Sequence, residues 1–286
     1  MQTRPIKSYC KINLFLDVGK KIKKLKLHNI QSLIFQLNIY DEISIKKNRL
    51  SKDVIKFEGK FAKNVNKKNN SVNDTLRLLR KKGFIKKGNN YQVVIKKNIP
   101  VFSGFGGGSS NAATIIRFFT KNKILQKNDI DYFSKTLGSD LRIFLMSSKI
   151  FQKNLISLKN FNKNYKFYFI LVYPYLKCST QEIYSRLSDY KNIKNRNTYR
   201  SNSRIDLANN LQLEENSLQK IVVSKFSVIN KILFQLYLIK DCYLSRVTGS
   251  GSACFGLFLK KKSAELGLRK IKKQFPKLWC VVGKTI

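Results

Sequence analysis

Residues 100–113 have the sequence Pro100-Val-Phe-Ser-Gly-Phe-Gly-Gly-Gly-Ser-Ser-Asn-Ala-Ala113, in which four glycines fall within five positions. Glycine has no Cβ, so its backbone can adopt positive φ and approach a ligand closely. The apolar residues that follow predict a helix, and a helix that begins directly behind glycines points its free N–H groups and positive dipole end at the loop. The pattern therefore predicts an anion site, most often a phosphate site.

The segment before the glycines supports this prediction. Residues 91–95 alternate as a strand does, and residues 96–100 lead from that strand into the loop. A flexible linker or a tight turn is the alternative, but linkers are seldom followed at once by a capped apolar helix. Two common phosphate loops do not fit. No lysine follows the glycines as a Walker A loop requires, and Ser109 stands where a dinucleotide fingerprint needs a third glycine or alanine.

The loop instead resembles the Pro-x-x-x-Gly-Leu-Gly-Gly-Gly-Ser-Ser-x-Ala-Ala motif of the GHMP kinases, with Phe105 at the usual leucine. The resemblance implies that this segment binds ATP together with Mg²⁺, and that a hydroxyl of Ser109 or Ser110 adds a ligand toward the metal. The residues assigned to nucleotide binding on this basis are consecutive: Pro100, Val101, Phe102, Ser103, Gly104, Phe105, Gly106, Gly107, Gly108, Ser109 and Ser110.

Composition sets the broad class of the protein. The 286 residues are 43% hydrophobic, which is enough for one large domain or two ordinary ones. Lysine and arginine number 57 against 16 acidic residues, a net charge of +41 that would normally suggest a nucleic-acid or anionic-membrane partner. The lysines, however, are spread over the whole length and accompany abundant Asn and Ile, as in proteins of AT-rich genomes. We therefore expect no specific nucleic-acid partner, but a field that attracts polyanionic substrates.

Other sequence features predict a cytoplasmic bacterial enzyme, a monomer or homodimer with no membrane association. No apolar run approaches the roughly 20 residues of a membrane span, and residues 1–9 are not followed by an apolar signal core. The five cysteines include no Cys-x-x-Cys pair, and the chain has one histidine, which weakens any zinc proposal. The cysteines are expected to be free thiols in a reducing compartment.

The first predicted strand, residues 6–18, places Lys11 and Asn13 on one face, because strand side chains repeat every two residues. A lysine in a strand is usually just solvated. However, Cys10-Lys-Ile-Asn-Leu14 is similar to the Ala-Lys-Ile-Asn-Leu strand of the GHMP branch that acts on a cytidine diphosphate ester of methylerythritol. The resemblance implies a catalytic role for Lys11 and substrate binding by Asn13.

The next motif, Leu27-His-Asn-Ile-Gln-Ser-Leu33, resembles the Gly-Tyr-His-x-Leu-x-Ser/Thr-Leu run of the same branch. A lone histidine is usually incidental, but the resemblance makes His28 a substrate-binding residue. Leu27 replaces the family tyrosine, so part of the cytidine contact is unaccounted for.

Asp140 lies in Leu137-Gly-Ser-Asp-Leu-Arg-Ile-Phe-Leu145. Position alone suggests a helix N-cap. The segment also resembles the family's Leu-Gly-Ala-Asp-Val-Pro-Phe-Phe stretch, with Arg142 at the usual proline. The resemblance implies that Asp140 is the catalytic base, which takes the proton of the acceptor hydroxyl, and that Lys11 beside it offsets charge on the transferred phosphoryl group.

Two motifs in the second half extend the resemblance. Residues 173–184 resemble the family's His-Pro … Ser-Thr-x-x-x-Phe/Tyr stretch, in which an aromatic ring stacks on cytosine. This makes Thr180 and Tyr184 substrate-binding candidates, the alternative for Tyr184 being a core residue of a helix. Residues 245–258 resemble the family's third glycine motif, so Gly249 and Gly251 are expected to form a tight turn against the phosphate loop or an ordinary turn between strands.

The resemblance covers nearly the whole chain and implies an α+β, two-domain GHMP kinase fold. It places a ribosomal-protein-S5-domain-2-like α/β domain at residues 1–160 and a ferredoxin-like domain at residues 161–286. We also expect a turn at Asp41-Glu42, two short strands within residues 48–69, and helices over residues 70–83, 110–121 and 129–137.

The function implied is ATP-dependent phosphorylation of the 2-hydroxyl of that cytidine diphosphate ester, in non-mevalonate isoprenoid precursor synthesis. Two alternatives remain open. One is a GHMP kinase for another small alcohol, of the homoserine or mevalonate type. The other is a basic nucleic-acid-binding protein with a degenerate kinase fold, which would bind RNA in a salt-dependent manner and consume no ATP.

Overall fold

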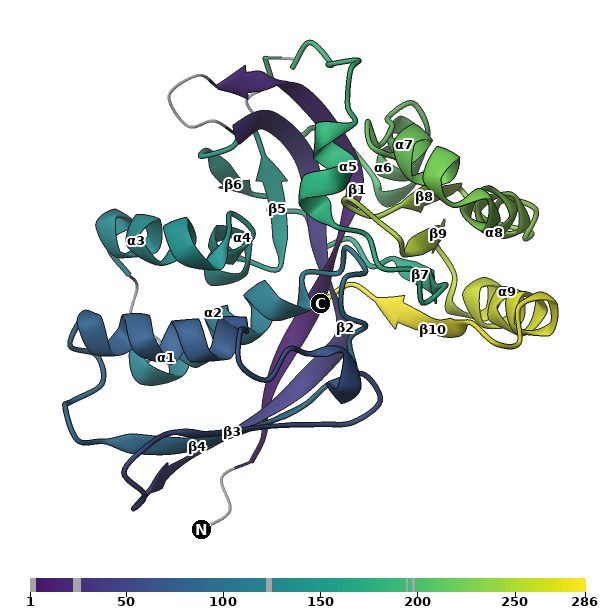
Figure 1. Cartoon of the computed structure of the whole chain (residues 1–286). Helices are drawn as coiled ribbons and strands as arrows, with labels where there is room; N and C mark the ends of the chain where they lie inside the picture. The colour runs from purple at the N-terminus through teal and green to yellow at the C-terminus, as the bar shows by residue number, and fades with distance from the viewer. Residues whose placement is uncertain (1–3, 23–26, 122–124, 194, 197–198) are drawn as a thin grey trace. The chain divides into compact units, whose positions relative to one another are not determined.

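The computed structural model describes residues 4–22, 27–121, 125–193, 195–196 and 199–286. These fall into two compact units, each assembled from several segments of the chain. The first unit comprises Met1–Cys10, Ile39–Val101 and Gly106–Ser147, and the second comprises Lys11–Asn38, Phe102–Phe105 and Ser148–Ile286. The long strands β1 (Ile6–Ile22) and β2 (Leu27–Asn48) therefore contribute residues to both units (Figure 1). The domain boundary at residues 160/161 stays a prediction.

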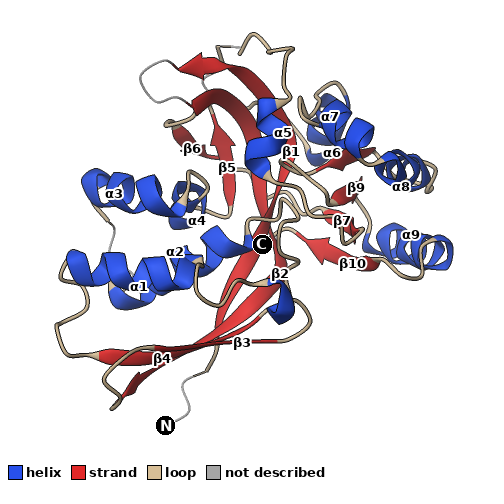
Figure 2. Cartoon of the chain, in the orientation of Figure 1, coloured by secondary structure: helices blue, strands red, loops and turns tan. Residues whose placement is uncertain are grey.

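The first unit is a sheet covered by helices (Figure 2). Strand β4 (Asn90–Lys96) pairs in parallel with β3 (Val54–Glu58) and antiparallel with the second half of β2. The helices are α1 (Ser71–Lys81), α2 (Gly107–Phe119), α3 (Lys127–Leu137) and α4 (Leu141–Met146). Apolar side chains of α1 and α2 pack against those of the strands, among them Leu76, Ile116, Ile43 and Val93.

The predicted helix over residues 70–83 is confirmed, including both of its ends. The Asn70 side chain accepts hydrogen bonds from the backbone N–H groups of Val72 and Asn73, at 3.1 and 3.0 Å, as an N-cap residue does. Gly83 follows the last turn with φ +76°, the left-handed conformation that glycine adopts readily after a helix. Helix α2 begins three residues before the predicted Ser110, because Gly107 and Gly108 are already helical.

Two local predictions in this unit are wrong. The turn expected at Asp41-Glu42 is absent, and β2 continues through both residues. Asp41 is fully buried in the strand, so its polarity serves an internal hydrogen-bond network and not a turn. Residues 48–69 contain one strand, β3, and the short 3₁₀ helix η1 (Ala62–Asn64) instead of two strands.

A buried hydrogen-bond network around Asp41 connects β2 to residues 97–99, which follow β4, and to Asn111 in α2. The Asp41 carboxylate accepts hydrogen bonds from the backbone N–H groups of Asn98 and Ile99, at 2.8 and 2.9 Å, and pairs with the Lys97 ammonium. Lys97 also donates to Oδ1 of Asn111 in α2 at 3.0 Å. Burial lowers the pKa of Lys97, while the neighbouring Asp41 carboxylate opposes that shift. Two opposite charges thus lie together in the core under the loop.

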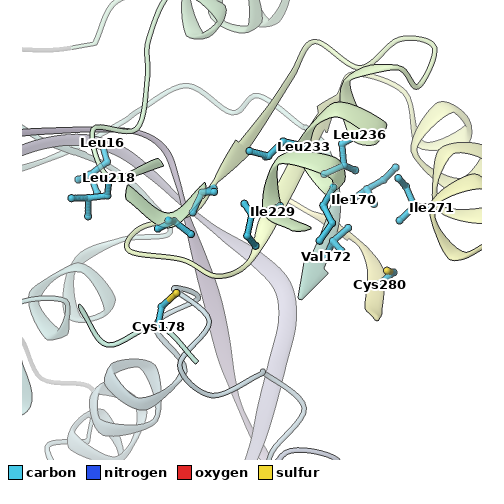
Figure 3. Close-up of a cluster of buried hydrophobic side chains, with 14 of the residues drawn as sticks. Leu16, Ile170, Val172, Cys178, Leu218, Ile229, Leu233, Leu236, Ile271 and Cys280 are labelled. Carbon is cyan, nitrogen blue, oxygen red and sulfur yellow. The ribbon is translucent and has the colours of Figure 1, made fainter. Parts of the chain in front are cut away.

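The second unit contains an antiparallel sheet in the order β10-β7-β9-β8. These strands are β7 (Tyr168–Tyr173), β8 (Leu244–Val247), β9 (Cys254–Phe258) and β10 (Trp279–Lys284). Helices α8 (Ser227–Tyr237) and α9 (Lys261–Gln274) contribute buried residues to a core with the strands. Figure 3 shows Ile229, Leu233 and Leu236 of α8 and Ile271 of α9 beside Ile170 and Val172 of β7.

The described part of the second unit also contains two short strands and three further helices. Strand β5 (Lys149–Gln152) pairs antiparallel with β2 and with β6 (Leu158–Asn160). The other helices are α5 (Thr180–Ser185), α6 (Arg204–Gln212) and α7 (Gln219–Lys225). Across the described ranges, no helix combines the length and hydropathy needed to cross a bilayer.

Replacement of Asp41 by asparagine is expected to destabilise the protein by about 3–5 kcal/mol, because the Lys97 ammonium would remain buried without its counter-charge. Asp74→Asn is the matched control. Asp74 pairs with Arg77 on the exposed surface of α1, and removal of such a pair costs less than about 1 kcal/mol. Urea denaturation followed by circular dichroism measures both values. Equal effects of the two substitutions would contradict this account of Asp41.

Candidate active site

The glycine loop ends at an exposed helix start in the first unit. Gly106, the N-cap of α2, has φ +71° and contributes no side-chain cap, and the first turn of α2 contains no acidic residue. Gly108 is exposed and Ser109 is half-buried. Because the first N–H groups of a helix have no partner within it, this uncapped start offers donors to an anion.

The two serines behind these glycines differ in their surroundings. Ser110 is 2% exposed, and its hydroxyl donates to the Tyr9 carbonyl at 2.6 Å and lies 2.7 Å from the Ser8 hydroxyl. It therefore joins α2 to β1. The Ser109 hydroxyl is the more accessible of the two predicted metal ligands.

Asp140, the predicted catalytic base, occupies the N-cap position of α4 in the first unit. Its carboxylate makes no capping hydrogen bond to that helix, so capping is not its function. The residue is half-buried. Arg142, which replaces the family proline, lies within α4, and its guanidinium pairs with Asp131 of α3 at 2.9 Å.

Lys11 and Asn13 lie in the interior of the second unit and not on its solvated surface. Lys11 is 4% exposed, and its ammonium donates to the Asn13 side-chain oxygen at 2.6 Å. The Asn13 amide nitrogen donates to the Ser32 hydroxyl at 2.8 Å, which in turn donates to the Phe15 carbonyl at 2.5 Å. The interpretation of Lys11 as a solvated strand lysine is wrong, because the side chain is buried. Burial of an ammonium group is unfavourable unless it has a hydrogen-bond acceptor, and Asn13 supplies one.

Three sequence motifs converge around this pair in the second unit. The Lys11 backbone N–H donates to the Phe105 carbonyl at 2.9 Å, which joins β1 to the loop. The Asn13 backbone N–H donates to the Thr248 hydroxyl at 3.0 Å, which joins the same strand to the turn between β8 and β9. That turn contacts the loop directly, since a Cβ on Gly104 would lie 2.3 Å from the Thr248 carbonyl oxygen. The turn containing Gly249 and Gly251 therefore joins two strands and also packs against the loop.

The aromatic residues of the loop have different surroundings. Phe105, which replaces the family leucine, is 1% exposed and packs against Trp279, with ring centroids 5.9 Å apart. Its ring is therefore part of the core behind the loop, and its carbonyl accepts the Lys11 N–H. Phe102 is more than half exposed and has φ +57°, an uncommon conformation for a residue other than glycine.

The other predicted nucleotide-binding residues at the start of the loop are largely buried. Ser103 is buried, and its carbonyl accepts the Ala253 N–H at 3.1 Å. Pro100 is buried and Val101 is half-buried, both in the first unit.

A cavity of about 360 Å³ lies beside the loop within the second unit. Its lining includes Phe102, Gly104, Cys178, Thr180 and Ser250. The predicted binding residue Thr180 is exposed, and its hydroxyl lies 3.0 Å from that of Ser250. Burial raises the pKa of Cys178 to about 11, so this thiol is neutral near pH 7 and contributes no charge to the cavity.

His28 belongs to a cluster of three rings in the second unit. Its Nδ1 lies 3.0 Å from the Gly19 carbonyl oxygen, and its ring centroid is 5.5 Å from that of Tyr184 and 5.4 Å from that of Tyr190. The Tyr190 and His28 rings are stacked, with planes 24° apart. Sequence analysis missed Tyr190 because it lies in a polar segment with no secondary structure. Leu27, at the family tyrosine position, is half exposed.

Among the described residues, no group of three or more His, Cys, Asp or Glu side chains is placed to hold a metal ion. Mg²⁺ in phosphoryl-transfer sites is commonly held by one or two protein side chains together with substrate phosphates, so the site does not need such a group.

Comparison with known proteins identifies the family. The model of the GHMP kinases N terminal domain matches residues 70–138, and the GHMP kinases C terminal model matches residues 191–277. The chain belongs to the GHMP kinase family, and its two-sheet α+β structure is the GHMP kinase fold.

Within that family, the chain is similar over its whole length to a kinase of one named activity. The 4-diphosphocytidyl-2-C-methyl-D-erythritol kinase of Pelagibacter ubique (strain HTCC1062) is 32% identical over 288 residues, covering 100% of both proteins.

Solved structures support the fold. A crystal structure of 4-(cytidine 5'-diphospho)-2C-methyl-D-erythritol kinase matches with a TM-score of 0.71 and 18% identity, covering 99% of both chains. Homoserine kinase from Cytophaga hutchinsonii matches with a TM-score of 0.70 and 13% identity, covering 100% of this chain and 96% of the other. The backbone alone therefore does not distinguish the two alcohol substrates.

Gly104→Ala is expected to disrupt the loop, because the added methyl group would overlap the Thr248 carbonyl. Gly88→Ala is the matched control: Gly88 has nearly the same φ, +82° against +86°, but its Cβ would meet nothing within 4 Å. The control should cost about 1 kcal/mol of backbone strain. Gly104→Ala should cost clearly more and abolish ATP binding, measured by thermal unfolding and calorimetric titration. Similar losses in both variants would show that the close contact is unimportant.

Proposed function

We propose that this chain transfers the γ-phosphoryl group of ATP to the 2-hydroxyl of 4-diphosphocytidyl-2-C-methyl-D-erythritol, a step of non-mevalonate isoprenoid synthesis. The observation that carries the proposal is the buried Lys11–Asn13 pair beside the glycine loop, with the His28 ring cluster in the same unit. The full-length relative that bears this activity in its name supports the choice of substrate.

In this proposal the glycine loop binds the ATP phosphates. The uncapped start of α2 presents N–H donors and the positive end of the helix dipole. Mg²⁺ bound with ATP neutralises charge on the β- and γ-phosphates. Ser109 is the better protein ligand for it, because the Ser110 hydroxyl is already engaged with Tyr9 and Ser8.

Asp140 is proposed to accept the proton of the acceptor hydroxyl, a contribution of about 10²–10⁴-fold. Lys11 is proposed to stabilise charge that develops on the transferred phosphoryl group. Its hydrogen bond to Asn13 and burial in the second unit restrict the ammonium to one position, so little reorganisation is needed during the reaction.

The cytosine base is proposed to stack against the ring cluster formed by His28, Tyr184 and Tyr190. Aromatic stacking on a base contributes about 1–3 kcal/mol and requires only an accessible ring face. Tyr190 stacks on His28 and is exposed, so it can supply the ring that Leu27 does not. Thr180, on the cavity beside the loop, is proposed to contact the remainder of the substrate.

Asp140→Asn is expected to reduce kcat by at least about 10²-fold and leave the affinity for ATP nearly unchanged, because the amide keeps the shape but cannot accept the proton. Asp129→Asn, which breaks a surface ion pair with Lys82, serves as the control and should retain activity. A coupled ADP-release assay measures both. Near-normal turnover in Asp140→Asn would exclude the proposed role.

Tyr190→Ala is expected to raise KM for the cytidine substrate by about tenfold with little change in KM for ATP. Adding Leu27→Tyr to Tyr190→Ala should restore part of the loss, because a ring returns to the same histidine. Tyr237→Ala, on the exposed face of α8, is the control. A KM unaffected by Tyr190→Ala would remove this residue from the base site.

A further inference from the structure

A second cavity, of about 300 Å³, lies in the second unit and contains none of the residues assigned to phosphoryl transfer. Its lining comes from β5, β6, the residues after β6, and the segment before α6. The lining residues are Phe151, Lys159, Asn160, Phe161, Asn162, Lys163, Tyr199, Arg200, Ser201 and Asn202. This volume is at the lower end of the range for small-molecule sites, about 300–1,000 Å³.

The aromatic part of the lining is buried. Phe151, Phe161 and Tyr199 are each less than 10% exposed, and the Phe151 and Tyr199 ring centroids lie 6.1 Å apart. The Phe161 ring also packs against the Phe35 ring, and the two ring centroids lie 5.5 Å apart. Packed rings of this kind form a rigid surface suited to an apolar or aromatic group.

The charged part of the lining is entirely positive. Lys159, Lys163 and Arg200 are exposed, and no acidic residue is among the described residues that line the cavity. Two described acidic residues bond to lining residues, and both are engaged. Asp206 accepts from the Asn202 N–H at 2.7 Å and from the Asn210 amide at 3.1 Å, and Glu214 accepts from the Tyr199 hydroxyl at 3.4 Å and pairs with Arg196. Three cations with a planar guanidinium among them are suited to a phosphate group.

Ser201 provides an independent indication of a ligand. The residue is 6% exposed, and its hydroxyl oxygen is buried without a hydrogen-bond partner among the described residues. The Ser201 carbonyl, in contrast, accepts a hydrogen bond from the Tyr165 hydroxyl at 3.3 Å. A buried hydroxyl without a partner is unfavourable and uncommon, whereas a phosphate oxygen in the cavity would give it one.

We propose that this cavity binds a small organic phosphate whose carbon part is aromatic or apolar. The phosphate group is held by Arg200, Lys163 and the Ser201 hydroxyl, and the carbon part lies on the three rings. The site is separate in its residues from the proposed kinase site, so it can exist whether or not the proposed substrate is correct.

The test is calorimetric titration of the full chain with phenyl phosphate, inorganic phosphate and phenol. Phenyl phosphate is expected to bind at least about tenfold more tightly than either other probe, because only it uses both parts of the cavity. Arg200→Gln should weaken its binding about tenfold or more and Ser201→Ala about fivefold, whereas Lys262→Gln on α9 should leave it unchanged.

If Ser201 served only to stabilise the fold, Ser201→Ala would lower the Tm of the unliganded protein. The proposal predicts otherwise. Since its hydroxyl has no partner, Ser201→Ala should not lower the Tm of the unliganded protein, while it should reduce the Tm increase produced by phenyl phosphate. The proposal is overturned if phenyl phosphate does not bind, if it binds no better than inorganic phosphate, or if its affinity is the same in Arg200→Gln and in the unaltered chain.

Discussion

The contact between Gly104 and the Thr248 carbonyl is the constraint on which the proposed chemistry depends. Any side chain at position 104 would lie 2.3 Å from that oxygen. The contact joins the glycine loop to the β8–β9 turn, and the Lys11 N–H holds the loop to β1 at Phe105. Motifs separated by more than ninety residues thus meet in one compact unit, where the Lys11 ammonium is buried and oriented by Asn13.

Buried cations accompany the glycine segment in both units, and each has specific acceptors. Lys97 has the Asp41 carboxylate and the Asn111 side-chain oxygen, and Lys11 has the Asn13 side-chain oxygen. The chain has only 16 acidic residues against 57 basic ones, and one of the 16, Asp41, is fully buried. The excess positive charge elsewhere is suited to attract a substrate that carries a diphosphate.

Much of this organisation was predictable from the sequence, because local signals were strong. Asn70 and Gly83 mark the ends of α1, and the glycines mark the start of α2. The GHMP kinase fold and family followed from motifs in a fixed order. Asp41 was misinterpreted as a turn residue, because its partners at residues 97–99 are distant in sequence.

Other features had no local signal at all. Lys11 has the pattern of a solvated strand residue, and only packing in the second unit buries it. Tyr190 lies in an irregular polar segment, so its stacking on His28 required the folded chain to be seen. The second cavity combines rings and cations from segments about forty residues apart, none of which forms a motif. The catalytic assignments of Lys11 and Asp140 stay predictions that kinetics must test.

The substrate can be determined directly by supplying the unaltered chain with ATP, Mg²⁺ and one alcohol at a time, and following ADP release and product phosphorus by ³¹P NMR. The alcohols are 4-diphosphocytidyl-2-C-methyl-D-erythritol, homoserine and mevalonate. The account predicts that only the cytidine compound supports turnover, with one new phosphomonoester signal for each ADP released. Turnover with homoserine or mevalonate instead, or no ATP consumption with any of the three, would contradict it.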